Sequence, residues 1–363
     1  MGPGCHAPSV HAPHVAVPRS WSDLTPAWMT AALAGPFPGV VVADVTVSDV
    51  ADGTNRSARV RLRYRDGYGR GPEAVFVKRE GRPLHRLALL ALRAVDTEAR
   101  LFDAGAPLPL DHPAAYFAAV DRRRLAAVVV MEDVTLRSGR PNNAAVPLTV
   151  GQVADGLRGL ANLHAAYWDR PLPPDLAFLL PWQLGKVWAP VSLTSLWLAG
   201  SRLRATGRGH LLPDDVRPAI LEQQFRHWAA VAASGPQTVL HGDPHPGNTY
   251  ALPGDRTGFY DWQLARTGNW SHDVGYFVGS SLTVADRRDH ERQLLRAYLD
   301  HLADAGAPAP DFDHAWDRYR QTPAFGLASW LHTVAGGRFQ PLDVSLAIIE
   351  RFAAAYADRE AGR

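Results

Sequence analysis

The two halves of this chain carry opposite secondary-structure signals. After residue 134 helical patterns dominate, beginning with a capping box at 149–152. Before that point, one helix is expected at about 83–103. Segments of β-branched or alternating residues predict strands at 45–47, 58–64, 74–78, 115–120 and 126–131. Further helices are predicted near 213–233, 286–305, 312–322 and 342–358. Strands first and helices afterwards predict an α+β protein with a strand-rich first part and a larger helical second part.

The composition excludes several classes of protein. The chain has 363 residues, enough for two domains, and 46% hydrophobic residues, enough for a sizeable core. The net charge of +2 argues neither for nor against nucleic acid, but no long basic stripe with interleaved aromatics is present, so no nucleic-acid partner is expected. The sequence contains no run of about 18 apolar residues, so no membrane span is expected. Cys5 is the only cysteine, and residues 1–18 do not resemble a signal peptide, so a disordered tail and a cytoplasmic location are expected.

The stretch His241-Gly-Asp-Pro-His-Pro-Gly-Asn248 is the strongest chemical signal. A buried strand at 238–240 leads into it, and two strands follow at 249–252 and 258–260, joined by a turn. Asp261 ends the second of these strands. Because a hairpin brings its two ends together, Asn248 and Asp261 are expected to face the same point.

These residue types are the ones that phosphoryl transfer requires. One carboxylate, Asp243, would orient an attacking hydroxyl. An amide oxygen from Asn248 and a second carboxylate from Asp261 would hold Mg²⁺ on nucleotide phosphates. Positioning and charge stabilisation dominate this reaction, so little else is demanded of the protein.

The strand-rich part offers a partner for the phosphates. Lys78 ends an apolar strand, from which its side chain can reach the α- and β-phosphates. A lysine in that place needs an anion to hold it. Glu98 on the following helix is the best candidate, since Asp96 points to another face and Glu80 is too near in sequence.

Two further segments are candidates for nucleotide contacts. The loop 52–57, with Gly53 and Thr54, would lay backbone N–H groups over the phosphates, although it holds only one glycine. The segment Met131-Glu132-Asp133-Val134 would supply the adenine-binding hinge. Glu132 and Val134 would contribute backbone groups there, with Val130 and Met131 against the base.

This layout of two lobes, with the loop in the helical one, is that of the protein-kinase-like fold. The loop and its second aspartate resemble the aminoglycoside phosphotransferase and choline kinase superfamily. A nearer likeness is to its bacterial ecdysteroid-kinase-like branch. Three segments carry it: 21–28 (WSDLTPAW), 131–134 (MEDV) and 160–168 (LANLHAAYW). The resemblance covers nearly the whole chain.

The resemblance implies ATP-dependent, or GTP-dependent, phosphorylation of a small-molecule hydroxyl with Mg²⁺. By position, Asp243 is the base, Asn248 and Asp261 are metal ligands, and Lys78 with Glu98 anchors the phosphates. The implied architecture is a bilobal protein-kinase-like fold with one key helix in the β-rich lobe. Its expected parts are a tail at 1–18, an N-lobe at 19–132 and a C-lobe at 133–363. The glycine-poor loop 51–57 departs from the family pattern.

Other polar residues near the motif have simpler interpretations. His241 is expected to bond backbone around the loop, and His245 to face solvent. His164, on the apolar face of a helix, is expected to be a core histidine. Asp273 is expected to brace the loop by hydrogen bonding without taking part in the chemistry.

The tryptophan-rich segment before the loop bears on the acceptor. Core packing is the default for such residues, and an aromatic wall for the acceptor is the alternative. Asp175 is the only acid in residues 170–212, which favours a lipophilic alcohol, a sugar or another antibiotic over a polycationic aminoglycoside. The tryptophans are Trp182, Trp188, Trp197 and Trp228.

Three other functions remain open at this point. His241-x-Asp243-x-His245 superficially resembles a metal-ligand run, which would suit a metal-dependent hydrolase. A catalytically silent nucleotide-binding module and a peptide Ser/Thr kinase of natural-product modification are also compatible with the motif. The sequence predicts no oligomeric state.

Overall fold

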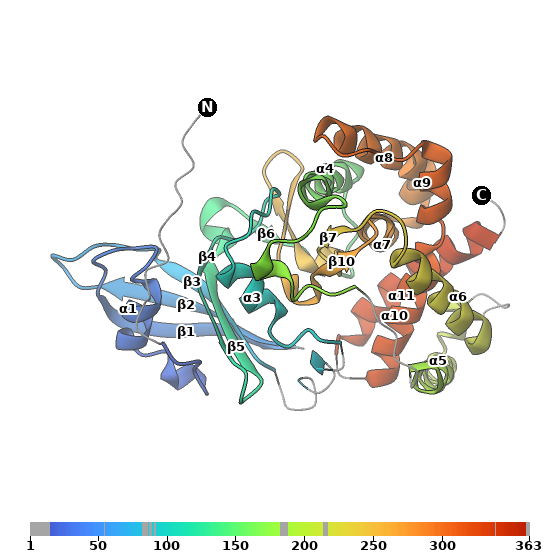
Figure 1. Ribbon diagram of the computed structural model, residues 1–363. Helices are drawn as coiled ribbons and strands as arrows, with labels where there is room; N and C mark the ends of the chain where they lie inside the picture. Colours follow the sequence, from blue (N-terminus) through green and yellow to red (C-terminus); the bar gives the residue numbers. More distant parts are fainter. Residues whose placement is uncertain are drawn as a thin grey trace. The chain divides into compact units, whose positions relative to one another are not determined.

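The computed structural model divides the chain into two compact units (Figure 1). Unit 1 comprises Met1–Gly105 and Pro113–Leu136, and unit 2 comprises Ala106–His112 and Arg137–Arg363. The structure describes residues 15–53, 55–81, 86, 89–90, 92–181, 188–212, 217–337 and 339–360. Unit 1 is built on an antiparallel sheet and unit 2 is mostly helical, so the predicted α+β class is confirmed.

A five-stranded antiparallel sheet forms unit 1, with the strand order β1-β2-β3-β5-β4. All the predicted strands are present, because each predicted segment is β-branched or alternating. Their bounds are β1 (Val42–Asp52), β2 (Arg56–Tyr64), β3 (Ala74–Arg79), β4 (Ala115–Asp121) and β5 (Ala126–Glu132).

The two faces of this sheet bury different partners. On one face Val60, Val77 and Val130 pack with Met29 and Leu33 of α1 (Pro26–Leu33). On the other face Val129 and Met131 pack with Ala99 of α3 (Thr97–Asp103). Alternation along β5 therefore places neighbouring side chains in separate cores.

The single helix predicted at 83–103 is wrong over the described residues. Leu89 and Leu90 are helical, but the chain then turns, and α3 begins anew at Thr97. Arg93 takes a left-handed conformation at φ +55°, with its N–H on Leu90 O and the Ala94 N–H on Leu89 O. This is a Schellman C-cap with arginine in the position usually held by glycine, which the sequence pattern did not predict.

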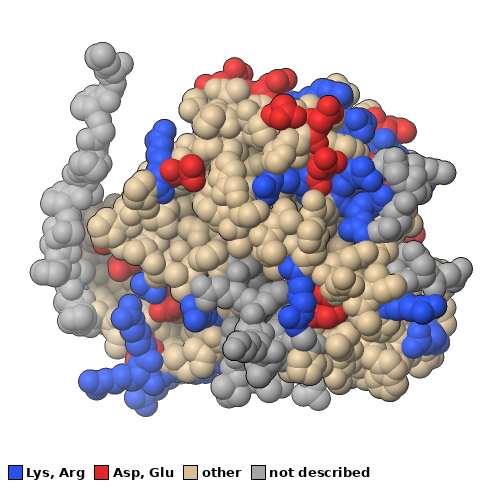
Figure 2. Space-filling model, turned by 45° about the vertical axis from the view of Figure 1, so that its right-hand side comes forward, with Lys and Arg blue, Asp and Glu red and all other residues tan. Residues whose placement is uncertain are grey.

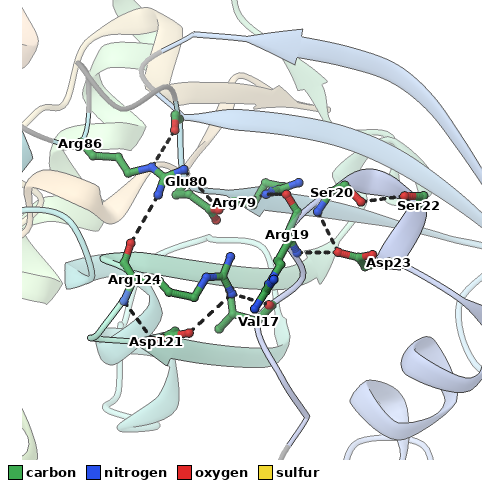
Figure 3. Close-up of polar contacts among 11 residues, drawn as sticks. Val17, Arg19, Ser20, Ser22, Asp23, Arg79, Glu80, Arg86, Asp121 and Arg124 are labelled. Carbon is green, nitrogen blue, oxygen red and sulfur yellow. Dashed lines mark hydrogen bonds and ion pairs between the residues drawn. The ribbon is translucent and has the colours of Figure 1, made fainter.

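Side chains from β3 and from the turn between β4 and β5 hold the segment that precedes α1 (Figure 3). Arg79 Nη2 donates to Arg19 O at 2.5 Å, and Arg124 Nη1 donates to Val17 O at 3.1 Å. Both guanidinium groups thus bind backbone carbonyl oxygens, which any residue at positions 17 and 19 would provide.

Arg79 is itself paired inside unit 1. Its Nη2 lies 3.0 Å from Glu80 Oε1, and both side chains are almost wholly buried. Arg86 Nη2 lies 3.6 Å from the same carboxylate oxygen. Glu80 is therefore committed to these arginines, which agrees with its exclusion as a partner of Lys78.

Helices make up most of unit 2. Four predicted helices are confirmed with shifted ends: α6 (Pro218–Ala232), α8 (Val284–Asp304), α9 (Phe312–Tyr319) and α11 (Leu342–Glu360). The predicted capping box starts α4 (Val150–Tyr167), where Thr149 Oγ1 accepts from Gln152 N at 3.0 Å and Gln152 Oε1 accepts from Thr149 N at 3.0 Å.

Two small antiparallel sheets carry the loop that the sequence analysis singled out. One joins β7 (Thr238–Leu240) to β10 (Arg266–Gly268). The other has the order β6-β8-β9, from Arg140–Pro141, Thr249–Leu252 and Arg256–Phe259. The predicted hairpin is confirmed as β8 and β9.

Among the described helices of unit 2, three were not predicted: α5 (Trp188–Ala205), α7 (Ser271–Ser281) and α10 (Thr322–Gly336). All 11 residues of α7 are buried, so no polar face alternates with an apolar one. Most of α10 is buried as well, against α5, α6, α7 and α11. A periodicity argument fails for helices that are surrounded by protein.

The tryptophans of unit 2 differ in environment. Trp228 is 2% exposed and stacks on Phe325 with ring centroids 3.8 Å apart, so it belongs to the core. Trp197 on α5 is 62% exposed. Trp182 and the side chain of Trp188 lie outside the described residues.

Within the described residues, no helix is long and apolar enough to cross a lipid bilayer. Acidic and basic side chains both appear on the face drawn in Figure 2.

Candidate active site

The second residue of the loop from His241 to Asn248 is a glycine whose backbone conformation other residues cannot adopt at this place. Gly242 has φ +84°, and a Cβ atom there would lie 2.0 Å from Leu264 O. No other residue fits, because both the left-handed backbone and the close approach exclude a side chain. This contact fixes the start of the loop against the segment that follows Asp261.

Asp273, in the first turn of α7, braces the loop as predicted. Its Oδ2 accepts from His241 N at 2.7 Å and its Oδ1 accepts from Gly242 N at 3.0 Å. Burial raises the pKa of Asp273, but the hydrogen bond from His164 and nearby histidines outweigh it, so the pKa lies below the usual value. The carboxylate is therefore ionised while it holds two backbone amides.

The two predicted structural histidines have fixed partners. His241 Nδ1 accepts from Asp243 N at 3.3 Å, so its Nε2 carries the proton and donates to Tyr260 O at 3.0 Å. His164 is fully buried, with Nδ1 at 2.8 Å from Tyr298 Oη. Both interpretations from the sequence are confirmed.

Asp243 and Asn248 are in direct contact. Asn248 Nδ2 lies 3.0 Å from Asp243 O and 3.1 Å from Asp243 Oδ2. Because both of these oxygens are acceptors, the amide must turn its NH₂ group toward them. Its Oδ1 then points away from Asp243, as a ligand for a cation requires.

Asp261 approaches the same carboxylate. It has φ +64°, in the left-handed region that few residues other than glycine adopt, and the short helical turn Trp262–Leu264 follows it. Burial raises the pKa of Asp243 to about 8, and the charge of Asp261 acts in the same direction. Two carboxylates and an amide oxygen at one place fit a hard divalent cation, which would relieve this repulsion.

Arg266 was not identified from the sequence. It is 5% exposed on β10, and its Nε donates to Leu264 O at 2.9 Å. Burial lowers the pKa of its guanidinium to about 9, while the charges of Asp243 and Asp273 oppose this shift. A charged residue within a short buried strand was the signal that could have revealed it.

The prediction that His245 faces solvent is wrong. The side chain is 4% exposed, its Nδ1 accepts from Gly247 N at 3.1 Å, and its ring meets Trp330 edge-on at 5.3 Å. Its Nε2 lies 3.7 Å from Asp243 Oδ2. Burial lowers the pKa of His245 to about 4, so the ring is neutral at pH 7. The packing partner Trp330 lies about 85 residues later in the sequence, so the local sequence around His245 could not predict its burial.

Within unit 1, Lys78 and Glu98 form the expected ion pair. Lys78 Nζ lies 2.8 Å from Glu98 Oε2, and the two side chains are 10% and 7% exposed. Lys78 comes from the end of β3 and Glu98 from the first turn of α3. The pair is present, and its contact with phosphates stays a prediction.

The loop between β1 and β2 gives no support for phosphate contacts. Gly53 N donates to Asn55 O at 3.0 Å, so this N–H is used inside the turn, and Thr54 lies outside the described residues.

The hinge prediction is only partly consistent with the structure. Glu132 ends β5, where its N–H donates to Ala114 O, and Val134 is buried at the next turn. Val130 and Met131 cannot both face one base, because they lie in the two separate cores of the sheet.

The family model described as "Phosphotransferase enzyme family" matches residues 56–299, more than half of the chain. The chain belongs to the phosphotransferase enzyme family. This confirms the resemblance at the level of the superfamily, while the ecdysteroid-kinase-like branch stays a prediction. The matched region of this phosphotransferase contains Lys78, Glu98 and the whole loop from His241 to Asp261. As a member of the family it acts on hydroxyl acceptors.

Several solved structures are similar to the phosphotransferase. A macrolide 2'-phosphotransferase from Brachybacterium faecium is 17% identical, covers 84% of this chain and 94% of its own, and has a TM-score of 0.43. An ethanolamine kinase from Plasmodium vivax is 11% identical over 87% and 83%, at 0.49. A choline kinase from Streptococcus pneumoniae is 11% identical over 91% and 98%, at 0.46. No curated protein matches the chain.

Proposed function

We propose that this phosphotransferase transfers the γ-phosphoryl group of ATP to a hydroxyl of a small molecule. The observation that carries the proposal is the contact of Asp243 with Asn248, with Asp261 beside them. An acceptor hydroxyl would donate its hydrogen bond to Asp243 and be aimed at phosphorus. Asn248 Oδ1 and Asp261 would hold Mg²⁺, which when bound supplies positive charge to the phosphates.

Lys78 is proposed to contact the phosphates of the nucleotide. Its pairing with Glu98 holds the ammonium group in a fixed position with little solvent around it. Glu132 and Val134 are proposed to bind adenine through their backbone groups. Gly53 and Thr54 remain a proposal for the phosphates, and Gly53 would have to give up its bond to Asn55.

The acceptor is proposed to be an uncharged or apolar alcohol, a sugar or a related antibiotic. The acid-poor segment 170–212 supports this choice over a polycation. Its helix α5 exposes Val191 and Trp197, at 58% and 62%.

The hydrolase alternative has little to support it. Both ring nitrogens of His241 are engaged by backbone groups, so neither is available to a metal without breaking the loop. Across the described residues there is no group of three or more His, Cys, Asp or Glu arranged to hold a metal ion.

The decisive experiment is a panel of alcohols, sugars, aminoglycosides and Ser/Thr peptides incubated with Mg-ATP or Mg-GTP. ADP or GDP release and a product heavier by one phosphate are the expected results. Asp243→Ala should abolish transfer while nucleotide binding is retained. Near wild-type turnover in Asp243→Ala would show that Asp243 is not the base. Phosphorylation of peptides alone would replace the small-molecule proposal.

A further inference from the structure

The hairpin between Asn248 and Asp261 carries a tyrosine whose ring lies across the opposite strand. Tyr250 of β8 pairs with Gly258 of β9, and a Cβ atom at position 258 would lie 2.1 Å from a carbon of the Tyr250 ring. Side chains at diagonal positions of a hairpin share one face, so the ring reaches Tyr260. The two tyrosine rings are parallel, with their centroids 6.0 Å apart. Tyr250 is 0% exposed, so protein encloses its ring on all sides.

The backbone of Tyr260 connects the two residues that are proposed to bind the cation. Its N–H donates to Asn248 O at 3.0 Å, and its carbonyl oxygen accepts from His241 Nε2 at 3.0 Å. Asp261 follows directly in the chain, at φ +64°. A shift of Tyr260 would therefore change the separation between Asn248 and Asp261.

Two charged side chains of unit 2 fix the hydroxyl of Tyr250. Arg137 Nη2 lies 2.7 Å from Tyr250 Oη, and the tyrosine oxygen must accept this bond because a guanidinium group only donates. The hydroxyl in turn donates its proton to Asp111 Oδ1. Burial raises the pKa of Asp111, but the hydrogen bonds from Arg137 and Tyr250 outweigh it, so the pKa lies below the usual value. The carboxylate is therefore ionised, and the direction of both bonds is settled.

The same charged side chains also hold each other. Arg137 Nη1 and Nη2 donate to the two carboxylate oxygens of Asp111, at 3.2 and 2.7 Å, a bidentate contact that fixes both planar groups. Arg256 Nη2 of β9 lies 3.1 Å from Asp111 Oδ2. The guanidinium carbon of Arg137 also lies 5.3 Å from the centroid of the Tyr250 ring. Tyr250 is thus held at its ring and at its hydroxyl by residues outside the loop from His241 to Asn248.

We propose that Tyr250, held by Arg137 and Asp111, is a positioning residue for the two cation ligands. Its ring packs on the strand that leads into Asp261 and so sets the separation of that residue from Asn248. Mg²⁺ demands nearly octahedral geometry, so its ligands must be held at a fixed separation. This inference rests on the proposed function, in which Asn248 and Asp261 bind Mg²⁺.

The first test compares ATP binding with and without the cation. Calorimetry with ATP in excess Mg²⁺ should show an affinity lower by about tenfold in Tyr250→Phe, the lower end of the range for residues that orient metal ligands. The same titration in EDTA should give the wild-type affinity. Arg137→Met should have the same selective effect, because the hydroxyl loses the donor that orients it. Unchanged affinity in Mg²⁺, or a loss that persists in EDTA, would overturn the proposal.

A matched control removes a buried tyrosine hydroxyl from a similar set of charges elsewhere. Tyr319 Oη donates to Glu291 Oε2 at 2.8 Å, and Arg287 Nη1 donates to the same oxygen at 2.9 Å. Tyr319→Phe should lower the melting temperature about as much as Tyr250→Phe, yet leave the affinity for ATP in excess Mg²⁺ unchanged. If both variants weaken that affinity equally, the effect of Tyr250 is one of general stability and the proposal fails.

A second test uses the close approach of Tyr250 to Gly258. Gly258→Ala should also weaken ATP binding in Mg²⁺ alone, because the added methyl group would displace the ring. Tyr250→Ala removes the ring, so Gly258→Ala should have no further effect in that background. Losses that simply add would show that the methyl group acts elsewhere, which would count against the role of the ring.

Failure of the proposed function has a different outcome. If Asp261→Asn binds ATP in excess Mg²⁺ as tightly as the wild type, the cation site itself is wrong, and its positioning has no meaning. If Asp261→Asn loses affinity in Mg²⁺ alone while Tyr250→Phe and Gly258→Ala keep it, only this inference is wrong.

Discussion

Asp273 holds the backbone of His241 through a 2.7 Å hydrogen bond from the amide to its carboxylate. The other carboxylate oxygen binds the amide of Gly242, so one side chain from α7 fixes the two residues that precede Asp243. The loop from His241 to Asn248 is thus attached to a fully buried helix.

Replacement of Asp273 by asparagine should weaken this attachment. The amide keeps one acceptor oxygen and turns a donor toward the other N–H, which leaves that N–H without a partner. We expect a loss of about 1–3 kcal/mol in the free energy of unfolding, measured with urea. Asp313→Asn, at an exposed position in the first turn of α9, is the control and should stay within about 0.5 kcal/mol. Equal stability of both variants would refute the bracing role.

Gly242→Ala should be destabilising for two reasons that can be separated. The methyl group would collide with Leu264 O, and the backbone has φ +84°. Gly254→Ala provides the control, because Gly254 has φ +78° with open space around it. It should cost about 1–2 kcal/mol for the backbone alone. Gly242→Ala should cost about 1–3 kcal/mol more and reduce phosphoryl transfer. Similar melting curves for the two variants would contradict the close contact.

Asp261→Asn should weaken nucleotide binding only when Mg²⁺ is present, because the lost charge acts on the cation. Calorimetry with ATP in excess Mg²⁺ should show an affinity lower by at least about tenfold. The same titration in EDTA should give equal affinities for variant and wild type. A loss that persists in EDTA would mean that Asp261 shapes the loop without holding the cation.

Variants of the Lys78–Glu98 pair distinguish its contribution to folding stability from its contribution to activity. Lys78→Met leaves a nearly buried carboxylate without its partner and should cost about 3–5 kcal/mol. The double variant Lys78→Met/Glu98→Leu should regain most of that stability and remain inactive. Arg63→Met, in the exposed pair with Asp44, is the control and should change neither property. Activity in the double variant would exclude a phosphate role for Lys78.

Stability should fall as the pH decreases from about 6.5 to about 4. Burial lowers the pKa of His245, His272 and His332 to about 4 each, so in this range the unfolded chain binds protons that the folded protein does not. Asp243, with its pKa raised to about 8, opposes them, because the folded protein keeps its proton there. The three histidines therefore outweigh Asp243, and the net effect is a lower free energy of unfolding at lower pH.

Urea unfolding at a series of pH values measures this effect. Each net proton changes the free energy of unfolding by about 1.4 kcal/mol per pH unit. His332→Gln should make the slope shallower by one proton, and the ring of His332 is held by Ser192 and Ser195 of α5, not by the loop from His241 to Asn248. A slope of zero or of opposite sign between pH 6.5 and 4 would contradict the assignment.

Local signals predicted the strands and the loop, but contacts between distant segments were not predictable. The strand 74–78 and the loop 241–248 carry their patterns within a few residues. The burial of His245 depends on its ring contact with Trp330, which is far away in the sequence. The break of the helix at Arg93 was missed because arginine is rarely the left-handed cap of a helix.

The anchoring of the first residues by the sheet sets a limit on how far the protein can be shortened. A version that starts after Asp23 would remove the carbonyl oxygens of Val17 and Arg19, which Arg124 and Arg79 bind. Arg79 follows Lys78 directly on β3, so the strand that bears the lysine would lose the contact between Arg79 and the segment before α1. Trimming for crystallisation should therefore end before residue 15, and affinity tags belong ahead of that point.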